Sequence, residues 1–206
     1  ENSDQPLVSY DRPAFAPAGF NDPDLADATA KLARKFGISK EEQDDWSINS
    51  HLNALKSKEI LSSEITPILN QTNDLFTRKL NQKICERAPK LSDTITHANS
   101  AIAADAAGFV VLVSELFLKN KMCKAVEILG SGTSGVIPEE APLAPVGAIK
   151  ALLDRTEISL SNVAFIELME AYAAQAIICT RLCDLDLDKV NICLLYTSDA
   201  ADESSS

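Results

Sequence analysis

Residues 163–183, VAFIELMEAYAAQAIICTRLC, decide the fold because this one stretch passes from strand-like to helix-like sequence. The short apolar run Val163–Glu167 favours a strand. A long helix is predicted to follow it, from Glu170 to about Cys183. Strands that alternate with helices are typical of α/β folds, so this stretch predicts part of an α/β sheet.

The same alternation extends upstream of this stretch. Continuous apolar runs predict buried strands at Phe109–Val113 and Ala125–Leu129. Helices are predicted at Glu115–Lys124 and Val146–Asp154. We therefore expect an α/β sheet from about residue 99 onward.

The first hundred residues are expected to be mostly helical instead. Apolar residues at helical spacing predict a helix over Asp24–Phe36, and Gly37 follows as its C-terminal cap. Ser39 is predicted to begin a second helix, because Glu42 three residues later completes a capping box. The apolar face of this second helix is predicted to carry Ile48, Leu52 and Leu55, with Trp46 beside it.

Charge and cysteine content exclude several classes of protein. The 206 residues contain 19 Lys and Arg against 30 Asp and Glu, a net charge of −11, whereas a nucleic-acid binder needs a basic surface. No apolar run is long enough to span a membrane. The five cysteines show no disulfide spacing, which suits reduced thiols and a cytoplasmic location.

No catalytic set is visible in the residues alone. The chain has two histidines: His51 is expected at the surface on the polar side of its helix, and His97 lies in a Thr-rich stretch before Asn99. Cys179 and Cys183 share a helix face but have no histidine nearby in sequence, so they are predicted to be core thiols, not metal ligands.

Two other patterns resemble ligand sites without completing them. Residues 130–135, GSGTSG, match the dinucleotide fingerprint, but Val136-Ile137-Pro138 and two glutamates follow where a helix should open, so a loop is expected. Asp184, Asp186 and Asp188 imitate a calcium loop whose required glycine is replaced by Lys189. A solvated helix end is the better interpretation.

Six short motifs, in order along the chain, together resemble the thiolase family. The best of them is residues 166–175, IELMEAYAAQ, which is similar to the family pattern E-x-N-E-A-F-A-A-Q. The others are GISKEEQD at 37–44, EITP at 64–67, TITHANS at 94–100, PVGAI at 145–149 and DKVN at 188–191. Each motif is weak alone, but their shared order is specific.

The resemblance implies a layered α/β/α fold, incomplete in this chain, with a mostly helical loop domain. It implies that 1–98 form that loop domain, 99–123 the end of the N-terminal thiolase domain and 124–192 the first part of the C-terminal thiolase domain. Residues 193–203, CLLYTSDAADE, match a translated sequencing adapter, so we expect 193–206 to be a non-native tail. Residue 1 is also not Met, so the chain is expected to be an internal fragment.

The resemblance also implies an activity. Thiolases condense two acyl-CoA molecules, or cleave a 3-ketoacyl-CoA, through an acyl group carried on a cysteine. The nucleophilic cysteine, the G-H-P histidine and the second cysteine are expected outside this span, so the chain itself is predicted to be inactive. Coenzyme A thioester is expected as substrate, without a further cofactor or metal, in fatty acid metabolism, and the full-length protein is expected to be a homodimer or homotetramer.

Several family positions are present in this chain, some of them altered. Met169 stands at the Asn that holds an oxyanion-hole water, and a thioether cannot donate that hydrogen bond. Tyr172 replaces the Phe of the same motif, and Ala101 stands where the family places a CoA-contacting Ser, with Ser100 next to it. Arg78, four residues after Asp74, matches the arginine that contacts the CoA nucleotide.

These departures leave two alternatives to an active thiolase. The first is a divergent thiolase-like protein that binds acyl-CoA without condensing it. The second is an acidic α/β interaction domain unrelated to the family.

Overall fold

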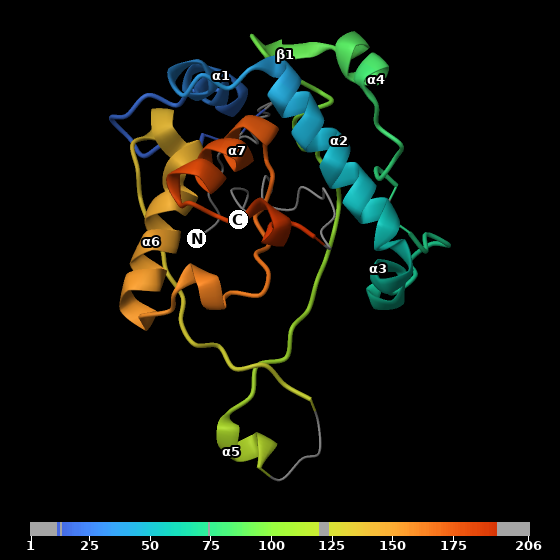
Figure 1. Ribbon diagram of the computed structural model, residues 1–206, viewed down its shortest axis with the longest axis vertical. Helices are drawn as coiled ribbons and strands as arrows, with labels where there is room; N and C mark the ends of the chain where they lie inside the picture. Colours follow the sequence, from blue (N-terminus) through green and yellow to red (C-terminus); the bar gives the residue numbers. More distant parts are fainter. Residues whose placement is uncertain (1–11, 13, 74, 120–123, 193–206) are drawn as a thin grey trace, which may run out of the picture.

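The computed structural model describes residues 12, 14–73, 75–119 and 124–192. Two helices, α1 (Leu25–Lys35) and α2 (Lys40–Lys56), lie near its N-terminus (Figure 1). Helix α1 begins at Asp24, whose side chain accepts hydrogen bonds from two N–H groups of the first turn. Gly37 then takes a left-handed φ of +67° and redirects the chain into α2. Both predicted helices are confirmed.

The start of α2 forms only half of the predicted capping box. The Glu42 N–H donates to Ser39 Oγ at 3.1 Å, as expected for a serine cap. The Glu42 carboxylate does not complete the box, because it pairs instead with Arg181 of α7 (Ala173–Leu182). The Glu42–Arg181 ion pair therefore connects the start of α2 to α7.

The remaining elements are short. They are α3 (Lys58–Glu64), α4 (Gln82–Arg87), β1 (Lys90–Ser92), β2 (Ile95–Thr96), α5 (Glu115–Leu118), η1 (Pro138–Leu143), α6 (Ala144–Thr156), η2 (Leu160–Asn162) and η3 (Leu187–Lys189). Strands β1 and β2 form an antiparallel pair in which Lys90 lies opposite Thr96 and Ser92 opposite Ile95. The predicted helices at 146–154 and 170–183 appear as α6 and α7.

The core lies where α1 packs against α7. Small side chains on α1, including Ala26, Ala30 and Ala33, meet Ile177 and Ile178 of α7 and are all at most 7% exposed. Alanines at the contact let two helices approach closely. A second cluster on the other side of α7 contains Leu168, Leu185, Val190 and both Cys179 and Cys183, which confirms these cysteines as core thiols.

The strands predicted in the second half do not form. Phe109–Val113 and Ala125–Leu129 are irregular and exposed, with Phe109 at 96% and Val126 at 94%. Of Val163–Glu167, only Ile166 is paired, in an isolated parallel bridge to Val190. Figure 1 shows that the chain after β2 leaves the helical body for α5 and then returns to α6. An apolar run becomes a strand only beside a partner, and the described residues place none along these runs.

The buried face of α2 also differs from the prediction. Leu52 is 40% exposed, whereas Gln43, Asp44, Ser47, Ser50 and His51 are each at most 5% exposed. The expected surface position of His51 is therefore wrong. Burial of polar groups costs least when they find partners, and neighbouring segments supply partners to Gln43 Nε2, Asp44 and His51.

Helix α5 is shorter than the predicted Glu115–Lys124, and 120–123 lie outside the described residues, as does the expected adapter-derived tail at 193–206. Among the residues that are described, no helix is both long and apolar enough to cross a bilayer.

Candidate substrate-binding site

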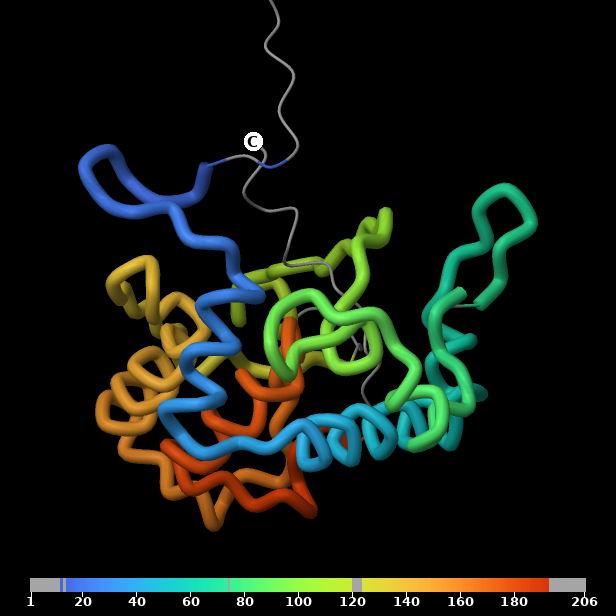
Figure 2. The backbone as a smooth tube through the Cα atoms, turned by 90° about the horizontal axis from the view of Figure 1, so that it is seen from above, coloured from blue at the N-terminus to red at the C-terminus, as the bar shows by residue number. Residues whose placement is uncertain are grey.

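The polar face of α2 connects the segments that carry the candidate residues. Asp44 contacts the segment around Ser100, and seven residues further along α2 His51 contacts the backbone of Arg78. Ser50 and Trp46 lie against Glu170, next to Met169. Figure 2 shows α2 running along one side of the molecule from α1 towards α3. One helix thus positions three separate candidate segments.

Ser100, Ala101 and Tyr172 are brought together by a short antiparallel pairing. Ser100 and Tyr172 form an isolated bridge. The Ala101 N–H donates to the Ala171 carbonyl, and the Ala173 N–H donates to the Asn99 carbonyl, both at 2.9 Å. Segments far apart in sequence therefore lie side by side immediately before α7.

Within this pairing, Ser100 faces inward. It is 3% exposed, and its hydroxyl donates to the Thr96 carbonyl at 2.8 Å. Ala101 is half-buried, so of the two positions Ala101 is the more accessible to a ligand. An alanine offers such a ligand a methyl group and a backbone but no hydroxyl.

Asn99 holds residues 94–101 in place through hydrogen bonds of its side chain. Its Nδ2 donates to Asp44 Oδ1 and to the Thr94 carbonyl, both at 3.1 Å, and its Oδ1 accepts the Thr96 N–H at 2.7 Å. Asp44 is also paired with Lys40. Buried polar groups that are all satisfied hold a unique geometry, so this network fixes the position of residues 94–101.

Met169 lies three residues before Tyr172, in an extended segment whose side chains alternate. Leu168 and Glu170 are each 6% exposed, whereas Met169 is 37% exposed. Tyr172 directly precedes α7 and is partly buried against the core. This burial raises the pKa of its phenol to about 12, and the negative charge of Asp24 adds to the shift. Tyr172 therefore stays neutral near pH 7.

Arg78 lies apart from these residues. Its N–H donates to His51 Nδ1 at 3.5 Å, and its side chain is exposed. Asp44 and His51 are separated along α2 by about 10 Å, from the rise of about 1.5 Å per residue. Burial, followed by the positive charge of Arg78, lowers the pKa of His51. His97, in contrast, is exposed.

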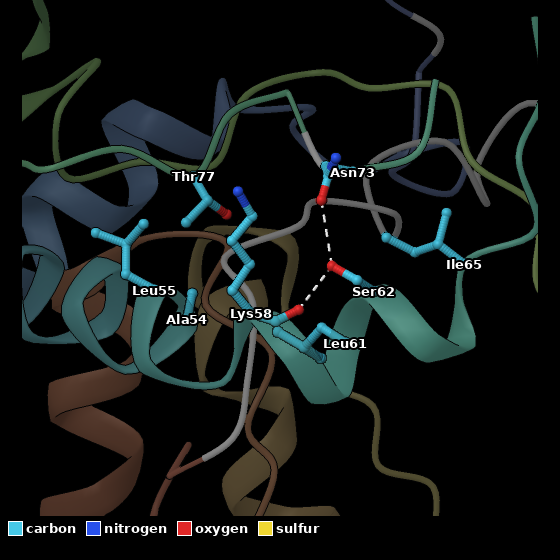
Figure 3. Close-up of a pocket in the computed structure, with 8 residues that line it drawn as sticks. All are labelled: Ala54, Leu55, Lys58, Leu61, Ser62, Ile65, Asn73 and Thr77. Carbon is cyan, nitrogen blue, oxygen red and sulfur yellow. Dashed lines mark hydrogen bonds between the residues drawn. The ribbon is translucent and has the colours of Figure 1, made fainter. Parts of the chain in front are cut away.

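Two hollows lie near α2, and neither has the character of a complete nucleotide site. The first, beside Thr77 and close in sequence to Arg78, has a volume of about 70 Å³, with Ser62 donating to Asn73 Oδ1 at 3.2 Å across it (Figure 3). Small-molecule sites usually exceed about 300 Å³. The second, of about 460 Å³ between α2 and α7, presents Asp45, Asp184 and the paired Glu42 and Arg181, so its net negative charge repels phosphates.

The GSGTSG segment at 130–135 is an exposed irregular loop, as expected, and the element that follows it is the 3-10 helix η1. Asp186 caps η3 by accepting the Asp188 N–H at 3.1 Å, which confirms a solvated helix end. Across the described ranges, no group of three or more His, Cys, Asp or Glu side chains is arranged to hold a metal ion.

Comparisons with known proteins point to one family. Residues 122–193 match the family described as thiolase, C-terminal domain. A Staphylococcus aureus protein named a probable acetyl-CoA acyltransferase is 31% identical over 189 residues, which are 84% of this chain and 48% of that protein. The crystal structure of the Bacillus anthracis acetyl-CoA acetyltransferase superposes with a TM-score of 0.78 at 26% identity, over 87% of this chain and 49% of that one. These matches support identification of the chain as a fragment of a thiolase-family protein.

A human mitochondrial 3-ketoacyl-CoA thiolase in complex with CoA is also similar, with a TM-score of 0.75 and 28% identity over 83% of this chain and 46% of that one. The thiolase chain described here thus spans about half the length of these relatives. The predicted thiolase-like α/β fold is confirmed, although only its helices and one small sheet are formed. An interaction domain unrelated to thiolases is excluded.

Several residues of the site were missed by sequence reasoning. Asp44, Asn99, Glu170 and Asn191 are buried polar residues that hold the candidate segments, yet none was predicted to have a role. Asn99 and Asn191 do fall inside the quoted motifs 94–100 and 188–191. The signal available in the sequence was a polar residue inside a motif whose other residues were interpreted as packing residues.

Proposed function

We propose that this thiolase-family chain is part of an enzyme that condenses two acyl-CoA molecules, or cleaves a 3-ketoacyl-CoA, through a cysteine acyl-enzyme. The observation that supports this most is the similarity in structure over 87% and 83% of the chain to an acetyl-CoA acetyltransferase and to a CoA-bound 3-ketoacyl-CoA thiolase. The motif order agrees with it. The acyl-transferring cysteines and histidine are proposed to lie in the half of the enzyme that this chain does not cover.

The proposed contribution of this chain is to bind and orient the coenzyme A thioester. Arg78, exposed on a fixed backbone, would pair with a phosphate of the nucleotide. Ala101 and Tyr172, held together before α7, would form part of the wall along the acyl-carrying arm. Ser100 would support this wall from the inside because its hydroxyl is used internally.

A second candidate function is binding of acyl-CoA without condensation, and Met169 favours it. Oxyanion stabilisation needs a hydrogen-bond donor, and a thioether has none. In a protein of thiolase length that contains this chain, Met169→Asn should raise turnover at least about tenfold if Met169 limits catalysis. Equal turnover in both forms, at an ordinary thiolase rate, would exclude the second function.

Binding of coenzyme A tests the proposal on the chain itself. We expect the 206-residue chain to bind acetyl-CoA and Arg78→Ala to weaken the binding about tenfold, because one charged contact to phosphate is lost. Isothermal titration calorimetry measures both values. Arg87→Ala is the matched control, an exposed arginine at the end of α4, and should bind like the unaltered chain. Equal weakening in both variants would contradict a specific role for Arg78.

No metal or further cofactor is included in this proposal. A cytoplasmic location, a role in fatty acid metabolism, and a homodimeric or homotetrameric full-length enzyme are proposed with it on the same family resemblance. Sedimentation of the full-length enzyme would decide between the two oligomers.

A further inference from the structure

Asn191 lies at the point where a short parallel pairing ends. The Ile166 N–H donates to the Lys189 carbonyl at 2.8 Å, and the Asn191 N–H donates to the Ile166 carbonyl at 2.8 Å. At Asn191 the backbone takes a left-handed φ of +51°. The main chain therefore leaves the line of the pairing at this residue, and asparagine is one of the residues that tolerate this conformation best.

The side chain of Asn191 continues the pairing that its backbone leaves. Its Oδ1 accepts the Leu168 N–H at 2.7 Å, and its Nδ2 donates to the Leu168 carbonyl at 2.9 Å. A carboxamide carries the same donor and acceptor groups as a peptide, so it takes the place of the next peptide unit in the ladder. The same Nδ2 also donates to Glu170 Oε1 at 2.5 Å.

These contacts hold the residues on both sides of Met169. Leu168 is held through both of its main-chain groups and Glu170 through its carboxyl group, and both are buried. Met169 lies between them and is 37% exposed. With both neighbours fixed inward, the alternation of an extended chain directs the Met169 side chain outward.

The left-handed backbone alone would not require asparagine. Glycine adopts that conformation at least as readily. Aspartate tolerates it too, but an ionised carboxylate only accepts hydrogen bonds and could not donate to the Leu168 carbonyl or to Glu170. Asn191 is therefore the residue type that meets both the backbone and the side-chain requirements.

We propose that Asn191 is a positioning residue that fixes Met169 in the extended segment Leu168–Glu170. The position of Met169 is the one that the thiolase resemblance gives to the oxyanion-hole group, and that functional meaning rests on the proposed function. The structural part of the proposal does not, because it is carried by contacts within this chain.

Hydrogen exchange followed by NMR on the 206-residue chain tests the proposal. Asn191→Gly keeps the left-handed backbone and removes the carboxamide. We expect the Leu168 amide to exchange at least about tenfold faster, because its acceptor is lost. Ile178, buried in α7, should keep its protection, which shows that the fold is retained. The labelled methyl signal of Met169, one of two methionines, should shift and broaden.

Asn70→Gly is the matched control. Asn70 also has a left-handed backbone, with φ of +68°, but it is exposed in the loop after α3. The same substitution there should leave the Leu168 amide and the Met169 signal unchanged. If Asn191→Gly keeps Ile178 protected and changes neither Leu168 nor Met169, the proposal is wrong.

Asn191→Asp decides the case if Asn191→Gly does not fold. It keeps the acceptor for the Leu168 N–H, so protection of Leu168 should stay within about threefold of the unaltered chain. It removes both Nδ2 bonds, so the Met169 signal should still shift. An unchanged Met169 signal in this variant would overturn the proposal. Because none of these measurements involves acyl-CoA, they give the same answer whether or not the proposed function holds.

Discussion

At the scale of single residues, the burial of polar side chains on α2 is what organises the candidate site. Gln43 donates to Thr94 Oγ1 at 3.0 Å, Asp44 accepts from Asn99, and His51 accepts from the backbone of Arg78. These hydrogen bonds offset the cost of burying the polar groups, and removing one partner leaves the other buried and unsatisfied. Substitutions here should therefore affect the site and the stability together.

His51 makes stability depend on pH. Its pKa is lowered below 6.5 in the folded chain, mainly by burial, so between that lowered pKa and 6.5 the unfolded chain binds more protons. The free energy of unfolding should therefore fall as the pH drops below 6.5. The slope contributed by one such group is at most about 1.4 kcal/mol per pH unit. Urea unfolding at a series of pH values measures it.

His51→Asn should remove this contribution, so that its unfolding free energy changes less with pH just below pH 6.5 than that of the unaltered chain. His97→Asn is the control because His97 is exposed, and it should keep the original slope. Equal slopes for the unaltered chain and His51→Asn would show that His51 is not the group responsible.

The sequence indicated which residue types occupy the family positions, but not whether their side chains point into the protein or towards its surface. Ser100 was as good a candidate as Ala101 from sequence, yet its hydroxyl is used inside the protein. The burial of His51 was hidden because helical periodicity ranked Ile48, Leu52 and Leu55 as the inner face. Periodicity assumes that the partner surface is apolar, whereas the surface that α2 meets also contains polar groups such as Thr94, Asn99 and Glu170.

At the scale of elements, the longer helices were predictable and the strands were not. The ends of α1 and α2 depend on local signals, such as Asp24, Gly37 and Ser39, which act within a few residues. A strand depends on a partner elsewhere in the chain. Phe109–Val113 has strand-like sequence, and no partner lies along it among the described residues.

The cap of α1 gives a direct test of these local signals. Asp24→Ala removes the hydrogen bonds to the Ala26 and Asp27 N–H groups, at 2.8 and 3.3 Å, and should lower the free energy of unfolding by about 1 kcal/mol. Urea unfolding measures the loss. Asp24→Asn keeps a capping oxygen and should lose less than half as much. Equal losses would mean that the charge of Asp24, and not its cap geometry, stabilises α1.

At the scale of the whole molecule, the exposed apolar segment 109–113 is the main departure from an ordinary monomer surface. Its five residues are between 41% and 96% exposed. Contiguous apolar surface of this kind favours self-association. The relatives are about twice as long as this chain, so they contain further residues against which such segments can pack.

Val111→Lys should therefore reduce self-association of the chain and its binding of an apolar fluorescent dye, without lowering the free energy of unfolding. Sedimentation velocity and dye fluorescence measure the two effects. Ser131→Lys is the control, because it adds the same charge at an exposed polar position. An equal reduction in both variants would attribute the effect to net charge alone.

The complete burial of α7 restricts which substitutions this chain can accept during evolution. Every residue from Ala173 to Thr180 is buried, so α7 has no outer face over those two turns. Helix α1, in contrast, alternates buried alanines with exposed Lys31, Arg34 and Lys35. Mutational drift in α1 can proceed along one side, whereas in α7 it is restricted at every successive position to replacements of similar size and polarity.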